Sequence, residues 1–303
     1  MSKTIAPLVS VIIPTYNHGH FLGRALQSVL DQTYDKWEAI VIDNHSTDNT
    51  DEVLRKFTDE RIRALKIHNN GVIAASRNMG IQAAHGEWIA FLDSDDWWKP
   101  QKLQVCLDRV KTSVDLVYHS LEIINDISDN KNIRVNGSRQ LKKPVIIDLL
   151  LNGNTISNSS VMVRKKVLEK IGKINENIDM VGAEDYNTWL RIAKNTDGFL
   201  MVNKPLGCYY LHENNYSLKD LSKAKAIATQ SYILLLSEKK RKRSVSVDEY
   251  LKGKRAYLGL EYNTALRYLC FSALNAKLEL QLKSIYMIVM CYLKLLTHSR
   301  PRD

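Results

Sequence analysis

Strand-like and helix-like segments alternate over residues 8–92, and this alternation constrains the fold more than any other feature. Four short apolar runs, at residues 8–13, 37–42, 62–67 and 87–92, have the pattern of buried strands. Helical patterns lie between them, over residues 21–30, 46–54 and 71–84. The order β-α-β-α-β-α-β predicts a doubly wound α/β fold with a mostly parallel sheet.

Polar side chains directly follow three of these runs. Residues 14–17 follow the first run, Asp43 and Asn44 the second, and residues 93–96 the fourth. In open α/β sheets, ligands bind at the carboxyl ends of strands, so we expect these segments to meet in one crevice. The chain has neither a GxxxxGK[ST] motif nor a GxGxxG motif after a strand. Kinase-like ATP binding and dinucleotide redox chemistry are therefore disfavoured.

Three carboxylates lie within four residues, at Asp93, Asp95 and Asp96. Carboxylates this close repel each other and raise each other's pKa, so the cluster is costly without a cation. A hard divalent ion suits oxygen ligands and usually takes one or two protein carboxylates, with water and substrate phosphates in its other positions. The cluster therefore predicts a Mg²⁺ or Mn²⁺ site, and a solvated acidic loop is the alternative.

The excess positive charge lies at one end of the chain. Residues 1–218 contain 26 Lys and Arg against 26 Asp and Glu, whereas residues 219–303 contain 17 against 7. The net charge of +10 therefore belongs entirely to the second region. We expect two domains, over 1–218 and 219–303, and an anionic partner for the second.

The second region has a helical pattern that the basic run at residues 239–243 is expected to interrupt. Residues 284–293 carry no charge but are too few to span a bilayer, so they predict a buried core helix or an interfacial segment. The N-terminus has no apolar signal-peptide core, and the four cysteines are scattered. Both features favour a reducing compartment, here the cytoplasm.

Six segments, in order along the chain, resemble motifs of the family-two glycosyltransferases. They lie at residues 9–17, 40–48, 69–80, 91–96, 184–191 and 211–214. The fourth segment matches the metal motif FLDxDD. The second departs from VVDDGSTD, because Asn44 and His45 replace the second acid and the glycine. The resemblance covers roughly residues 8–217. It implies a GT-A fold, which is Rossmann-like with a doubly wound, mostly parallel mixed sheet, here with an α-helical C-terminal extension.

The resemblance also implies the roles of individual residues. Asp93, Asp95 and His212 are expected to hold Mn²⁺ or Mg²⁺. Asp185 is expected to be the general base, with Glu184 as the alternative, although both acids also suit a helix N-terminus. The nucleotide-sugar is expected to contact Pro14, Tyr16, Asp43, Asn44, Asn69, Arg77, Asp93 and Ser94. An asparagine carbonyl at position 44 can still accept the uracil proton, so UDP is the expected nucleotide.

The activity implied is that of an inverting, metal-dependent hexosyltransferase. It would move a hexose from a UDP-sugar to a saccharide on a polyprenyl diphosphate, forming a β-linkage, in O-antigen or capsule synthesis. The basic tail would hold the enzyme peripherally on the anionic inner face of a bacterial cytoplasmic membrane, or would form a homodimer. Another nucleotide, a soluble acceptor, or an inactive sugar-binding scaffold are the alternatives. A nucleic-acid partner is disfavoured because the first two-thirds of the chain is neutral. No motif identifies the sugar, the acceptor or the linkage position.

Overall fold

The computed structural model describes residues 6–125, 134–135 and 138–298. These residues divide into two compact units, one within Met1–Ile146 and Asn154–Ala228, the other within Ile147–Gly153 and Thr229–Asp303. Residues 125–143 are polar and predict a variable loop, and residues 126–133 and 136–137 of it lie outside the described residues. The predicted division of roles between residues 1–218 and 219–303 stays a prediction.

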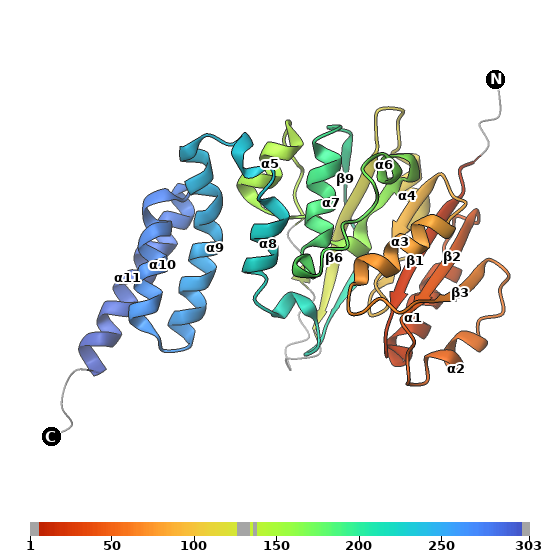
Figure 1. Cartoon of the computed structure of the whole chain (residues 1–303), viewed down its shortest axis with the longest axis horizontal. Helices are drawn as coiled ribbons and strands as arrows, with labels where there is room; N and C mark the ends of the chain where they lie inside the picture. The colour runs from red at the N-terminus through yellow and green to blue at the C-terminus, as the bar shows by residue number, and fades with distance from the viewer. Residues whose placement is uncertain (1–5, 126–133, 136–137, 299–303) are drawn as a thin grey trace. The chain divides into compact units, whose positions relative to one another are not determined.

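The first unit is built on one nine-stranded mixed sheet (Figure 1). Its strands are β1 Val9–Thr15, β2 Trp37–Asp43, β3 Ile62–Lys66, β4 Trp88–Phe91, β5 Trp97–Trp98, β6 Leu116–Asn125, β7 Arg134–Val135, β8 Met162–Arg164 and β9 Phe199–Leu211. The strand order is β3-β2-β1-β4-β8-β6-β9-β5, with β7 paired to β6. The first four strands of that order are parallel, and β8 joins them antiparallel to β4. The prediction of a doubly wound, GT-A-like α/β sheet is confirmed.

Helices cover both faces of this sheet (Figure 1). The α-helices of the unit are α1 Gly19–Leu30, α2 Thr50–Arg55, α3 Ile73–Ala83, α4 Lys102–Asp108, α6 Lys165–Lys170, α7 Glu184–Ala193 and α8 Ser222–Thr229. The residues of α5 Val145–Asn152 are divided between the two units. Short 3-10 helices are η1 Asn158–Ser160, η2 Ile178–Met180, η3 Tyr216–Leu218 and, in the second unit, η4 Ile233–Leu235.

Alternate residues of β1 point to opposite layers. Val11 and Ile13 belong to the buried cluster that includes Leu22 and Leu26 of α1. Ile12 faces α3, where a Cβ built on Gly80 would lie 2.6 Å from Ile12 Cγ2. Gly80 therefore permits α3 to pack closely on the sheet, and its lack of a side chain has a structural reason.

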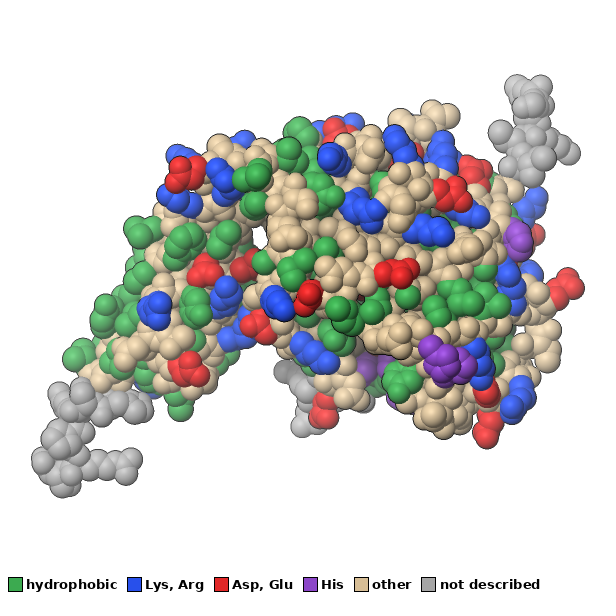
Figure 2. Space-filling model, in the orientation of Figure 1, with side chains coloured by type: hydrophobic (Ala, Val, Ile, Leu, Met, Phe, Trp, Pro, Cys, Tyr) green, Lys and Arg blue, Asp and Glu red, His purple; other side chains and the backbone are tan. Residues whose placement is uncertain are grey.

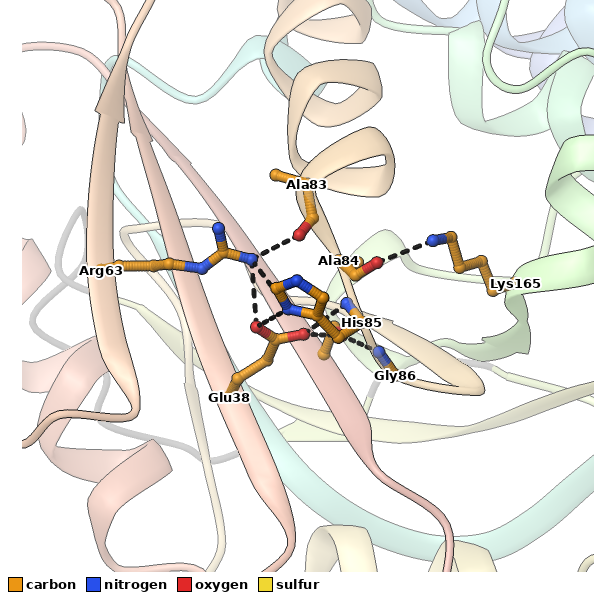
Figure 3. Close-up of polar contacts among 8 residues, drawn as sticks. Glu38, Arg63, Ala83, Ala84, His85, Gly86 and Lys165 are labelled. Carbon is orange, nitrogen blue, oxygen red and sulfur yellow. Dashed lines mark hydrogen bonds and ion pairs between the residues drawn. The ribbon is translucent and has the colours of Figure 1, made fainter.

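A polar cluster joins the start of β2 to the turn after α3 (Figure 3). Glu38 Oε1 accepts hydrogen bonds from Ser10 Oγ and the His85 backbone N–H, both at 2.6 Å. Its Oε2 pairs with Arg63 Nη2 at 3.1 Å. Burial alone would raise the pKa of Glu38, but these donors lower the pKa to about 2. The carboxylate therefore fixes the turn that leads into β4.

The second unit contains three helices side by side, α9 Glu238–Leu258, α10 Tyr262–Asn275 and α11 Leu278–His298 (Figure 1). Tyr262, Ala265 and Leu269 of α10 pack with Cys291 of α11. The expected break at residues 239–243 is wrong, because α9 runs through them. Lysine and arginine are good helix formers, and Glu238 pairs with Lys242 one turn later at 2.8 Å. Among the described residues, no helix is long and apolar enough to cross a membrane.

Candidate functional site

A cavity of about 830 Å³ opens at the carboxyl ends of β1, β2 and β4, where the sheet changes from parallel to antiparallel pairing. Sequence-predicted residues lining it are Pro14, Tyr16, Asn44, Asn69, Arg77, Asp93, Ser94, Asp95, Glu184, Asp185 and His212. The structure therefore brings together residues from six separate segments. Binding at a strand-order switch point is the expectation for an open α/β sheet.

Asp43 is the predicted site residue that does not line the cavity. Its side chain is fully buried, and its Oδ1 accepts hydrogen bonds from the backbone N–H of Ser46 (3.0 Å) and from Ser46 Oγ (2.6 Å). Ser46 Oγ in turn accepts the Asn17 backbone N–H at 2.8 Å. In this structure Asp43 joins the loops after β1 and β2, and its contact with a nucleotide stays a prediction.

Arg77 of α3 connects two acidic parts of the cavity. Its side chain is 4% exposed, with Nη2 2.7 Å from Asp93 Oδ1 and Nη1 2.6 Å from Glu184 Oε1. Burial alone would lower the pKa of this guanidinium, but the two carboxylates raise it above the usual value. The second oxygen of Glu184 accepts the Gly182 backbone N–H at 2.7 Å. Both oxygens of Glu184 therefore already have partners.

Asp185 is held differently, although it is adjacent to Glu184 at the start of α7. Its Oδ1 accepts the Tyr186 backbone N–H at 2.6 Å, and its Oδ2 accepts from Asn154 Nδ2 at 3.1 Å. Burial, and then the Glu184 charge, raise the pKa of Asp185 to about 7. A carboxyl group that titrates near neutrality can take up and release a proton at working pH. Glu184 is ion-paired with Arg77, whereas Asp185 accepts neutral N–H donors, and this difference favours Asp185 over Glu184 as a base.

The acidic loop after β4 meets the end of β9. Asp95 Oδ2 lies 3.1 Å from His212 Nε2 and 3.3 Å from Asn215 Nδ2. Burial, and then the Asp93 charge, raise the pKa of Asp95. Asp96 is buried and accepts the Tyr210 backbone N–H at 3.0 Å, so it orients the loop and does not line the cavity.

The donor set at Asp95 suits a hard divalent cation. A carboxylate and an imidazole lie together, and Asp93 is adjacent, although Arg77 already contacts Asp93 Oδ1. Across the part of the chain that the structure describes, no group of three or more His, Cys, Asp or Glu side chains is arranged around one point. That incomplete set fits an ion that takes few protein ligands and leaves positions for phosphate oxygens and water.

Tyr16, Asn44 and Asn69 occupy another part of the cavity wall. Tyr16 is 55% exposed, which leaves its ring available to a flat ligand. Asn44 Oδ1 accepts the Asn69 backbone N–H at 2.8 Å, and Asn69 Nδ2 donates to Ser76 Oγ at 2.8 Å. The expected carbonyl acceptor of Asn44 thus already binds the neighbouring loop. His45 has a φ of 53° and stacks on His68 with ring centroids 3.6 Å apart.

Sequence reasoning missed several polar residues of the cavity. His18 Nδ1 lies 2.9 Å from Ser94 Oγ, and Asn158 Nδ2 donates to Asp93 Oδ1 at 3.2 Å. Asn154 and Asn215 contact the predicted acids, as described above. Residues 152–160 are almost entirely small and polar and lie directly before a strand. That pattern was the available signal for Asn154 and Asn158.

The cavity thus combines a metal-suited acidic loop with a separate carboxyl group that titrates near neutrality. On a GT-A-like sheet this combination suits a glycosyltransferase, an enzyme that transfers a sugar to an acceptor. The model of glycosyl transferase family 2 matches residues 10–172, more than half of the chain, and the chain belongs to this family. Asp185 and His212 lie beyond the matched residues.

Relatives agree with this assignment. The chain is 34% identical over 191 residues to UDP-Glc:alpha-D-GlcNAc-diphosphoundecaprenol beta-1,3-glucosyltransferase WfgD of Escherichia coli, covering 63% of this chain and 71% of that protein. The fold of this chain resembles that of S. aureus TarS in complex with UDP-GlcNAc. The TM-score is 0.63, with 18% identity over 90% of this chain and 82% of that one. The fold also resembles that of a Pyrobaculum calidifontis mannosyltransferase in complex with GDP-Man and Mn²⁺, with a TM-score of 0.60 and 18% identity over 95% and 81%.

Proposed function

We propose that this enzyme transfers a hexose, with inversion, from a UDP-sugar to a lipid-linked saccharide. The observation that carries the proposal is the pairing, in one cavity, of Asp185 with the Asp93 and Asp95 loop. The pKa of Asp185 near 7 suits a general base, and the loop suits a cation that meets a diphosphate. A relative that uses UDP-Glc supports the choice of nucleotide and of a hexose.

The base of the nucleotide would pack on Tyr16 and meet Asn44. Asn44 Oδ1 accepts the Asn69 N–H, and Nδ2 is the hydrogen-bond donor of this side chain. It would donate to a carbonyl oxygen of uracil. UDP remains the donor nucleotide. Asn44 would donate a hydrogen bond to the base, whereas an acid at this position would accept one.

Asp95, with Asp93 and His212, would hold Mn²⁺ or Mg²⁺. The bound ion would neutralise charge on the diphosphate as it leaves. His212 and Asn215, which contact Asp95 Oδ2, are side chains that a cation can displace or share. Asp93 would contribute less, because Arg77 and Asn158 bind its Oδ1. A structural relative in complex with Mn²⁺ supports the choice of ion.

Asp185 would accept the proton of the acceptor hydroxyl. The hydroxyl oxygen then forms a bond to the anomeric carbon while the bond from that carbon to the diphosphate breaks. UDP leaves with the electron pair, and the attack from the opposite face inverts the anomeric centre, which yields a β-linkage from an α-linked donor. Asn154 would orient the Asp185 carboxylate toward the acceptor.

The acceptor would be a saccharide on a polyprenyl diphosphate, as in O-antigen or capsule synthesis. The support is the relative whose acceptor is GlcNAc-diphosphoundecaprenol. Such an acceptor is confined to a bilayer, so the enzyme would act at the inner face of a bacterial cytoplasmic membrane.

The test is a panel of UDP- and GDP-sugars, incubated with the purified chain and Mn²⁺, with and without a synthetic GlcNAc-diphosphoprenol. Release of UDP and a new β-linked disaccharide from one UDP-hexose are the expected results. Transfer from GDP-sugars alone, or product with retained configuration, would contradict the proposal. Asp185→Asn serves as the inactive reference.

A further inference from the structure

Helix α11 presents apolar side chains on two opposite faces. One face packs on α10 through Cys291, Met287 and Ile288. The other carries Leu278, Leu282, Ile285, Val289 and Leu293, which are 49% to 71% exposed. Their spacing of three and four residues places them in one stripe, which we call the outer stripe. Contiguous exposed apolar surface of this kind marks an interaction site.

Two tyrosines border the outer stripe. Tyr286 is 66% exposed and Tyr292 is 55% exposed. At 3.6 residues per turn they project to opposite edges of the stripe, about 120° apart. Tyrosine has an apolar ring and a polar hydroxyl, and it is enriched where a membrane meets water. A tyrosine at each edge of an apolar stripe is typical of a helix that lies in the headgroup layer, and a protein–protein interface does not require this arrangement.

The region that contains α11 carries a net positive charge. Residues 229–303 contain 14 Lys and Arg against 6 Asp and Glu. Hydrophobic side chains gather over α11 in Figure 2, with Lys and Arg among the neighbouring side chains of the same unit. Pairing of two copies through this region would bring two strongly positive units together, which is unfavourable. Anionic lipid headgroups have the complementary charge.

We propose that the outer stripe of α11 docks in the interface of a bilayer rich in anionic lipid. The helix would lie parallel to the surface, with the leucines and isoleucine below the headgroups and the basic side chains among them. The proposal rests on the proposed function for its purpose, since docking would raise the effective concentration of a lipid-linked acceptor. It rests on the exposed side chains and charge for its physical basis.

The experiment is flotation of the full chain with vesicles of phosphatidylglycerol and phosphatidylcholine, or of phosphatidylcholine alone, at low and high salt. The full chain should float with the anionic vesicles and much less with the neutral ones, and salt should weaken the binding. Ile285→Asp combined with Val289→Asp should reduce binding by about tenfold or more, because two charges enter the stripe. Ile178→Asp is the matched control, since Ile178 is 57% exposed in the other unit.

Equal flotation of the double variant and the unchanged chain, or none by the unchanged chain, would overturn the proposal. A dimer in sedimentation that the double variant converts to monomer, without vesicle binding, would assign the stripe to a second copy instead. Circular dichroism verifies that the variants remain folded. Binding of UDP-sugar without vesicles is measured in parallel, so loss of the proposed function and loss of membrane docking are read separately.

Discussion

Arg77 and Glu184 lie 107 positions apart in the chain, yet their side chains form a buried ion pair at 2.6 Å. The same guanidinium contacts Asp93, so one cation joins the loop after β4 to the start of α7. Removing one partner of a buried ion pair leaves the charge of the remaining partner uncompensated where water cannot solvate it well. Arg77 therefore organises the cavity even where it contacts no ligand.

Arg77→Met should lower the free energy of unfolding by about 3–5 kcal/mol, because the buried carboxylate of Glu184 and the partly buried carboxylate of Asp93 lose their counter-charge. Urea denaturation followed by tryptophan fluorescence measures this change. Lys223→Met is the control: Lys223 is 80% exposed and pairs with Asp179, so its loss should cost less than about 1 kcal/mol. Similar losses for the two variants would show that the buried pair has no special role.

Asp185→Asn should lower kcat/KM by about 10²–10⁴-fold while the donor Kd stays within about twofold, because the group acts on the acceptor. In the unchanged enzyme, kcat/KM should rise about tenfold per pH unit up to pH about 7 and then level off, because the base must be ionised. Asp179→Asn, at an exposed carboxylate, should change neither quantity. A profile that is flat from pH 5 to 8 would assign the role to another group.

The raised pKa of Asp185 makes activity rise with pH, whereas it makes the stability of the fold fall with pH. The folded-state pKa of Asp185 is raised to about 7, so ionisation disfavours the folded state as pH rises from about 4 to 7. Asp185→Asn should therefore raise Tm relative to the unchanged chain at pH 8 more than at pH 5. Thermal melts at the two pH values measure the difference.

Asp95→Ala should lower metal-dependent turnover by about 10²–10³-fold, since charge on the leaving diphosphate is no longer neutralised. Calorimetric titration of Mn²⁺ in the presence of UDP should show binding to the unchanged chain and none to the variant. Asp108→Ala, at an exposed carboxylate, is the control. Full transfer by the unchanged enzyme in excess EDTA would remove the metal from the mechanism.

Asn44→Asp should create a preference for the uracil N3–H. We expect the unchanged chain to bind UDP and 3-methyl-UDP within about threefold, because Asn44 would donate to uracil through Nδ2 while its Oδ1 accepts from the Asn69 N–H. The variant should favour UDP by about tenfold or more, since a hydrogen bond to a carboxylate is worth about 1.5–3 kcal/mol. Asn49→Asp adds the same charge at a residue outside the cavity lining. Strong rejection of 3-methyl-UDP by the unchanged chain would contradict the assigned polarity.

Glu38→Gln should destabilise the fold above pH 5 by about 1–3 kcal/mol, because the ionised group accepts four donors. The folded-state pKa is depressed to about 2, so this stability is present above the ordinary pKa and is lost as pH falls from about 4.5 to 2. Melting temperatures of the two proteins should converge over that range. Glu60→Gln, at an exposed side chain, should leave the melting temperature unchanged at every pH.

Local pattern predicted the parallel half of the sheet because its strands are continuous apolar runs and the loops that line the cavity follow them directly. The antiparallel half was less readable. Pro205 and polar neighbours interrupt β9, whose order comes from pairing with β6 and β5. Partners such as Asn154 and Asn215 lie in irregular segments, where no sequence periodicity indicates which way a side chain points. At residues 239–243, local charge suggested a break that helix propensity overrode.

His212 reaches Asp95 across 117 positions of the chain, and Asn215 across 120. During synthesis, both partners of the Asp95 carboxylate are made after the strands of the parallel half of the sheet. Until they emerge, the acidic loop stands without them, and contacts between residues so distant in sequence form slowly. Competence for chemistry should therefore appear late in biogenesis, after most of the first unit has been synthesised. Fragments that end before Asn215 would be expected to hold a sheet but no complete site.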